Sequence, residues 1–554
     1  MHLKYTHFLI FIAVLSYTSR VYSQDLRLEF NSNKKIENVF LSKINYETKH
    51  KDSTAVFDEI NKVQKIIKMN GYFLSSVDSV LQKNKKYTAY ITFQEKVDSV
   101  HLKYAYAPTL ILKKYNFKDN LIKLPINQLA QILNEISNQQ ELKGAAFSKV
   151  QLQNFKIRNK ILFTEIHFTS SKKRNIDKVI FKGYEDFPKS FVQNYFNIRS
   201  KTTFNKKKLT AISKLSQALN FASEIKPPET LFTKDSTFVY VYLKKIKGSS
   251  FDGLVNFASQ ENGKLQFNGY LDLKLKNILN KGEGFNLLWN RFGNERQEFS
   301  IAAKTPYIFN TKLSTALSFS IYKQDTTFLS TRVDTSLKYQ IRNNTNLFAT
   351  FLSENSENTA TDIENNISTY KSYFVGFGYA YKLPKNDVFR NDAFYVNINP
   401  SFGKRSTATN SFQQVKITTT VSYLLDLNKK ASFYLRNKTG ILNSENYFDN
   451  ELFRIGGTNS IRGFNEQSIF VKNYILQNIE YRYATSANSY LYTITDLAII
   501  STAKDKEKLY SIGVGYLFNT NTSQINISTA IGSNSKNSLN SKDAQFFVNW
   551  INFF

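Results

Sequence analysis

The spacing of the hydrophobic residues changes at about residue 250. Before that point, apolar residues recur at the three- and four-residue spacing of amphipathic helices. From about Phe251 onward, apolar and polar residues alternate at every second position, which is typical of strands with one apolar face. The helical spacing is clearest at Val56, Ile60, Val63 and Ile67, and the alternation is clearest over 313–322, 512–518 and 525–531. The pattern therefore predicts an α+β region followed by an all-β region.

The first half contains an internal repeat. Three short segments share the order apolar, acidic, polar, valine, and each precedes a helical pattern: Ile36–Val39, Val97–Val100 and Ile176–Val179. Recurrence at domain-sized spacing indicates tandem modules, each of which we expect to run β-α-α-β-β. We place the three modules at residues 24–96, 97–174 and 175–247.

The second half, residues 248–554, supplies strands in a number that favours a barrel. Eleven candidate strands lie between 251 and 442 and five more between 472 and 554, sixteen in all. An even number suits a single-chain bacterial barrel, with lipid outside and water inside. A soluble β-sandwich alternates in the same way, so the period alone leaves both classes open.

The N-terminus and the composition bear on location. Lys4, the short apolar run Phe8–Leu15 and the small residues that end at Ser23 predict a signal peptide over 1–23. The chain has no cysteine, which excludes disulfides and a lipid-anchored N-terminus. The net charge of +30 comes from lysines spread along the whole chain without a nucleic-acid-binding motif. We interpret the charge as a compositional bias, with weak attraction to anionic lipid or unfolded protein.

One glycine-rich segment carries the most specific signal. It is Phe453–Phe464, in which Gly456 and Gly457 precede Arg462, and Arg462 stands between Ile461 and Gly463. This segment resembles the signature loop of the BamA/TamA superfamily, outer-membrane barrels that insert or export other proteins. Shorter matches follow in the family's order: the turn Asn277–Glu283, Pro306-Tyr307, Asn478–Arg482 and Asp496. The terminal strand, with Trp550 and Phe554, resembles an assembly signal, although Asn549 and Asn552 depart from its usual pattern.

The resemblance implies a fold and a site. The fold would be three POTRA-like modules and a sixteen-stranded antiparallel barrel, with the loop between strands eleven and twelve. Arg462 would enter the lumen and pair with Glu480 and Asp496, and the alternative is that all three are solvated lumen charges. The loop signature would comprise Gly456, Gly457, Ile461, Gly463 and Phe464, with the glycines reversing the chain and Phe464 wedging the tip against the wall. Phe453 and Ile455 are expected to end strand eleven.

The sequence gives little support to catalysis. After signal cleavage only His50, His101 and His167 remain, widely separated, and no hydrolase, P-loop or metal-binding motif accompanies them. We therefore expect no catalytic residue, no metal site and no cofactor.

The function that the resemblance implies is a TamA-like insertase or translocase in the outer membrane, with its modules in the periplasm. Its partners would be unfolded client proteins, outer-membrane lipid and possible periplasmic proteins bound by the modules, and not nucleic acid. Two alternatives stay open. One is a two-partner secretion transporter for a dedicated substrate, and the other is a passive porin.

Overall fold

The computed structural model describes residues 26–104, 115, 120–259, 265–292, 296–360, 366–385, 387–389, 391–502, 505–535 and 537–554. The predicted signal peptide lies outside these residues. The chain forms two compact units. One reaches Asn175 and includes Thr203–Lys206, and the other holds Ile176–Thr202 and Lys207–Phe554. No helix among the described residues is long and apolar enough to cross a membrane.

The first sheet of the N-terminal unit has the strand order β2-β1-β4-β3, with β1 parallel to β4. Helix α3 begins after Asp52, whose carboxylate accepts the N–H of Ala55 at 2.8 Å. The predicted apolar face of α3 is buried against the sheet, so the expected helix is confirmed. The elements are β1 (Leu26–Asn31), α2 (Lys35–Lys43), β2 (Lys49–His50), α3 (Ser53–Met69), β3 (Ser76–Lys83) and β4 (Lys86–Thr92).

The repeat was misplaced at its first copy. Ile36–Val39 lies in α2, where Ile36 is 84% exposed, and the first strand is β1 instead. Ile36 and Val39 are three residues apart, and this spacing fits a helix as well as the repeat. A pattern of four residues is too short to distinguish a helix from a strand.

The second sheet of this unit has the order β6-β5-β8-β7, with β5 parallel to β8. Helix α5 covers it with Ile132 and Ile136, both fully buried. Among the described residues between β5 and α5 stands a strand, β6, and most of the residues between β5 and β6 lie outside the described part of the chain. The elements are β5 (Ser99–Lys103), β6 (Leu121–Pro125), η1 (Ile126–Gln128), α5 (Leu129–Leu142), β7 (Lys149–Arg158) and β8 (Ile161–Thr169).

The third sheet has the order β10-β13-β12. The strand β12 was not predicted from the sequence, because Pro227 and Pro228 interrupt its pattern. The prolines are tolerated because β12 lies at the edge of the sheet, where its pairing with β13 shifts register twice. The elements around it are β9 (Asn175–Ile176), β10 (Lys178–Lys182), α6 (Lys189–Asn194), β11 (Thr202–Thr203), α7 (Lys206–Gln217), β12 (Ala222–Phe232) and β13 (Thr237–Lys245).

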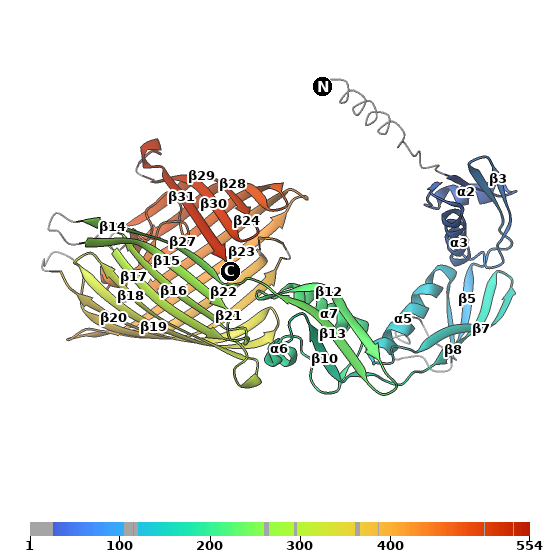
Figure 1. The fold of residues 1–554 in the computed structure, drawn as a ribbon, viewed down its shortest axis with the longest axis horizontal. Helices are drawn as coiled ribbons and strands as arrows, with labels where there is room; N and C mark the ends of the chain where they lie inside the picture. The colour runs from blue at the N-terminus through green and yellow to red at the C-terminus, as the bar shows by residue number, and fades with distance from the viewer. Residues whose placement is uncertain are drawn as a thin grey trace, which may run out of the picture. The chain divides into compact units, whose positions relative to one another are not determined.

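The rest of the chain is a closed barrel of antiparallel strands (Figure 1). Eleven strands precede the glycine-arginine loop and five follow it, which confirms the predicted sixteen. They are β14 (Ser250–Ser259), β15 (Leu265–Lys276), β16 (Gly284–Phe292), β17 (Arg296–Thr305), β18 (Leu313–Gln324), β19 (Phe328–Arg342), β20 (Thr345–Asn358), β21 (Tyr370–Pro384), β22 (Asp392–Ser406), β23 (Ser411–Asp426), β24 (Ala431–Asn443), β27 (Asn473–Ser486), β28 (Ser489–Ser501), β29 (Lys506–Asn519), β30 (Ser523–Asn534) and β31 (Gln545–Phe553).

The two faces of the barrel differ as a membrane requires. Large apolar side chains such as Leu317, Phe377 and Phe546 point outward and are 53%, 70% and 69% exposed. Polar side chains such as Asn478 and Asp496 point inward and are fully buried. An apolar exterior around a closed hydrogen-bonded ladder is how a β protein spans a bilayer, so the sandwich alternative is excluded and the barrel belongs in the outer membrane.

The barrel closes through a narrow seam between its first and last strands. β14 and β31 share two residue pairs, Ser250 with Phe553 and Phe251 with Asn552, whereas β30 and β31 share eight. The two departures from the assembly signal are polar partners here. Asn549 donates to the Asp252 carboxylate (3.1 Å), and Asn552 accepts the Ser523 hydroxyl (2.7 Å).

The segment between β10 and α7, which includes α6, contacts the short turns at one end of the barrel. Asn277, from the predicted turn, donates to the Tyr184 hydroxyl at 2.7 Å. The ring of Tyr307, from the predicted Pro-Tyr pair, meets the edge of Phe191 with 4.8 Å between centroids. Burial raises the pKa of the nearby Tyr195 to about 12, so its hydroxyl stays protonated. These short turns mark the periplasmic end, since outer-membrane barrels carry their long loops on the other side.

Candidate functional site in the barrel lumen

The loop between β24 and β27, residues 444–472, folds back into the lumen. Phe453 and Ile455 were expected at the end of strand eleven, but β24 ends at Asn443. Both residues belong instead to a small hairpin inside the loop, β25 (Phe453–Ile455) with β26 (Ile469–Val471). The hairpin forms because Ile455 and Val471 are buried in an apolar cluster against the inner wall, which a continued strand eleven could not supply.

Glycine is required where the loop turns and where it touches the wall. Gly456, Gly457 and Gly463 have φ of 117°, 86° and 81°, a region that disfavours side chains. A Cβ on Gly463 would lie 2.5 Å from the backbone nitrogen of Gly532, on β30. A Cβ on Gly532 would in turn lie 2.4 Å from the Phe464 ring. The loop tip therefore rests directly on β30.

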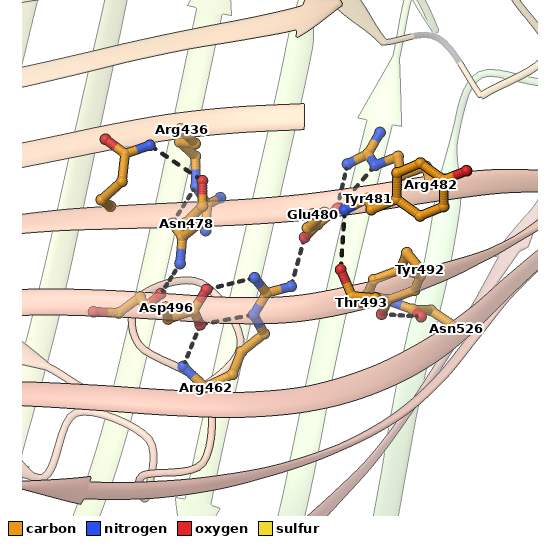
Figure 2. A network of polar contacts seen from close by, with 12 residues as sticks. Arg436, Arg462, Asn478, Glu480, Tyr481, Arg482, Tyr492, Thr493, Asp496 and Asn526 are labelled. Atoms are coloured by element: carbon orange, nitrogen blue, oxygen red, sulfur yellow. Dashed lines mark hydrogen bonds and ion pairs between the residues drawn. The ribbon is translucent and has the colours of Figure 1, made fainter. Parts of the chain in front are cut away.

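Arg462 joins this tip to the two strands that follow the loop, as Figure 2 shows. Its Nη1 donates to Glu480 Oε1 at 2.5 Å, and its Nε and Nη2 form a fork on Asp496 at 2.9 and 2.6 Å. The backbone N–H of Arg462 also donates to Asp496, at 2.9 Å. All three side chains are less than a tenth exposed. The structure thus brings the three residues together as one cluster, here called the loop anchor.

A second arginine makes the positive and negative charges of the loop anchor equal. Arg482 donates to Glu480 through Nε (2.9 Å) and Nη2 (2.8 Å), and its guanidinium lies 4.1 Å from the centroid of the Tyr434 ring. Two guanidiniums then face two carboxylates. This neutrality matters because an unpaired charge in a desolvated site is costly.

The backbone on either side of Arg462 is fixed as well. Asn478 donates to the carbonyl of Ser460 (3.0 Å), and Lys438 donates to that of Asn459 (2.6 Å). Ile461 is fully buried in the apolar cluster with Leu476 and its neighbours. These contacts determine the direction from which Arg462 approaches its partners.

The base of the loop has its own buried ion pair. Arg405, on β22, pairs with Glu451, in the short helix η3 (Asp449–Glu451), and the two side chains are 0% and 5% exposed. Gln414 also donates to Glu451, at 3.0 Å, and the Arg405 guanidinium stacks 4.1 Å from the Phe448 ring. The loop is therefore held both at its base and at its tip.

Comparison with known proteins identifies the fold. No family model and no curated protein matches the sequence. CdiB from Acinetobacter baumannii is 14% identical, with a TM-score of 0.51 over 90% of this chain and 97% of that one. CdiB from Escherichia coli is 13% identical, with a TM-score of 0.51 over 89% and 96%. BamA from Haemophilus ducreyi lacking POTRA domains 1–3 is 13% identical, with a TM-score of 0.48 over 82% and 99%.

This chain has the fold of the two CdiB proteins. Within that fold the predicted loop residues lie in the lumen, whereas Trp550 lies on the outer face of β31 and is 55% exposed. Phe554 follows β31, and its backbone N–H donates to the carbonyl of Ser249 across the seam at 3.0 Å. The two terminal aromatics therefore face different surroundings from the loop anchor.

Three contributors to the site in this barrel were not predicted from the sequence. Arg482 was noted only as part of a motif, although it lies two residues from Glu480 and so on the same strand face, which was a usable signal. Gly532 and the pair of Arg405 with Glu451 gave no signal, because their partners are distant in sequence. Among the described residues, no group of three or more His, Asp or Glu side chains could hold a metal ion. The arrangement positions a loop by charge pairing.

Proposed function

We propose that this protein is a TamA-like insertase or translocase that assembles or exports client proteins, and that it performs no catalysis. The observation that carries the proposal is the seam between β14 and β31, with its two residue pairs. A net backbone hydrogen bond contributes about 1 kcal/mol, so separating this seam is far easier than separating any neighbouring pair. A client strand that pairs with the freed edges satisfies them again, and burial of the client in lipid supplies the free energy.

The edges of the N-terminal sheets suit the capture of an extended client by strand addition. β3 and β7 each lie at the edge of their sheet, and no further strand in the described part of the chain pairs with their outer side. β7 is the longer of the two and exposes Phe155 (61%) beside Lys156 and Arg158. By contrast, Pro227 and Pro228 remove donors from β12. We therefore assign client capture to β3 and β7 rather than β12.

The test is to close the seam covalently. The chain has no cysteine, so Phe251→Cys with Asn552→Cys creates one possible disulfide across the seam. The matched control is Ile527→Cys with Val548→Cys, which joins β30 to β31. In a strain depleted of the native protein, the oxidised seam variant should fail to maintain outer-membrane protein levels, and reductant should restore them. The control should support normal levels in both states. Normal client levels with a fully oxidised seam would overturn the proposal.

A second candidate is a two-partner secretion transporter, favoured by the fold match to CdiB over nearly the full length of both chains. Depletion of the protein also distinguishes the insertase from the transporter. Loss of one secreted substrate, with outer-membrane proteins unchanged, would favour the transporter. A fall in several outer-membrane proteins would favour the insertase. A passive porin would leave both unchanged and alter only the uptake of small solutes.

A further inference from the structure

A cavity of about 340 Å³ lies in the lumen, away from the loop anchor. Residues of β16 to β20, β22 and β23 line it, and most of these residues have hydroxyl, amide or cationic side chains. Three cations line it, Lys304, Arg332 and Lys416, against a single carboxylate, Asp334.

The charges in this cavity do not balance. Arg332 forms a fork on Asp334, with Nε and Nη2 at 2.7 and 2.9 Å, so these two charges cancel. Lys304 and Lys416 have no hydrogen-bond or ion-pair partner in the part of the chain that the structure describes. Two positive charges therefore remain.

Two charged groups that are not part of the lining, Glu354 and Arg454, each have an aromatic partner. Glu354 accepts the Tyr370 hydroxyl at 2.7 Å, and Arg454 lies over the Tyr322 ring at 3.4 Å from its centroid. Among the lining residues themselves, the excess of two positive charges persists.

The unpaired lysines are held in place by their surroundings. The Lys416 ammonium lies 5.6 Å from the ring centroid of Phe374 and 4.9 Å from that of Phe453, which orients it by cation–π contact. The Lys304 stem passes over Gly284, where a Cβ would lie 2.5 Å from Lys304 Cε. Neither lysine is a freely extended surface side chain.

Gly376 lies against three polar residues of the cavity lining. A Cβ on Gly376 would lie 2.5 Å from the hydroxyls of Thr350 and Ser401 and 2.7 Å from Asn399 Oδ1. The bare backbone of Gly376 leaves these three polar groups gathered at one point of the lining. Ammonium, hydroxyl and amide groups around one space are the donors that a carboxylate prefers.

We infer that this cavity binds the carboxylates of Asp and Glu side chains in an extended client segment within the lumen. The inference rests on the proposed function, since it names a chemical class of client. Lipid phosphates are excluded as the ligand because the cavity opens to the lumen, while lipid contacts the outer face. The ligand chemistry is shared with small free carboxylates, so the test must separate the two sources.

The test measures binding of a fluorescent twenty-residue poly-glutamate peptide to the full-length protein in nanodiscs of neutral lipid, by anisotropy. The variant is Lys304→Gln with Lys416→Gln. The control, Lys382→Gln with Lys385→Gln, removes two lysines that are already paired, with Asp392 (3.2 Å) and Asp426 (2.6 Å). The variant should bind at least ~10-fold more weakly, as expected for the loss of charge-assisted hydrogen bonds. The control should bind like the wild type.

A charge-reversed variant, Lys304→Glu with Lys416→Glu, should prefer a poly-lysine peptide. The mobility shift on heating verifies that each variant is folded. Equal binding by the wild type and the glutamine variant, or equal weakening in the control, would show solvated lumen charges only and overturn the site. Competition by free glutamate at the same carboxylate concentration would overturn its assignment to a peptide. These results do not depend on the seam disulfide, so failure of the site and failure of the proposed function are distinguishable.

Discussion

Replacing Arg462 by alanine tests the loop anchor most directly. The change removes the guanidinium that joins Glu480 and Asp496 to the loop tip, while the backbone N–H at position 462 can still donate to Asp496. Glu480 keeps Arg482 as its partner at 2.9 and 2.8 Å. Asp496, which is fully buried, loses its only cation among the described residues.

The structure gives a magnitude for this loss. Breaking a buried ion pair costs ~3–5 kcal/mol, and we expect the lower end, ~3 kcal/mol, because one of the two carboxylates stays neutralised. The ratio of docked to undocked loop should then fall by about 100-fold. Arg462→Lys should recover roughly half of this docking free energy, because one ammonium group cannot form the fork on Asp496 and also reach Glu480. Arg462→Ala with Asp496→Asn should also be more stable than Arg462→Ala alone, since it removes the stranded charge.

The assay is limited proteolysis of intact cells, followed by complementation of a depletion strain. The alanine variant should reach the membrane, show new cleavage within residues 444–472 and lose client assembly. The lysine variant and the double variant should lie between alanine and the wild type. An unchanged digestion pattern with normal client levels would mean that Arg462 is a solvated lumen charge.

Three further changes test other parts of the barrel. Arg405→Ala leaves Glu451 buried without its cation and should cost ~3–5 kcal/mol; a heat-induced mobility shift at the wild-type temperature would contradict this. Gly532→Ala places a methyl group against the Phe464 ring and should destabilise the docked loop by ~1–3 kcal/mol, seen as faster proteolysis of the loop, and wild-type cleavage rates would refute the close contact. Asp252→Ala removes the polar contact across the seam, worth ~1 kcal/mol, and should increase thiol labelling of a cysteine placed in β31; unchanged labelling would show that this contact does not hold the seam.

The sequence predicted what depends on local period and on motif spacing. The face of α3 and the sixteen strands are of this kind, whereas the meeting of Arg462 with two carboxylates was expected from the family resemblance. The errors arose where several structures fit a short pattern. Ile36–Val39 suits a helix as well as a strand, and Pro227-Pro228 suggests a break although it lies within an edge strand. The pairing of Arg405 with Glu451 depends on the return path of the loop, which no local pattern encodes.

The loop and the seam are linked by the strands that the loop touches. On one side of the seam its tip rests on β30, through the contact of Gly463 with Gly532. On the other side Gln467 donates to Glu298, on β17, at 3.2 Å. The docked loop thus ties together the two walls that must separate when β14 and β31 part. Undocking the loop should therefore loosen the seam, so Arg462→Ala should slow disulfide formation between cysteines at positions 251 and 552. An unchanged rate would mean that loop and seam move independently.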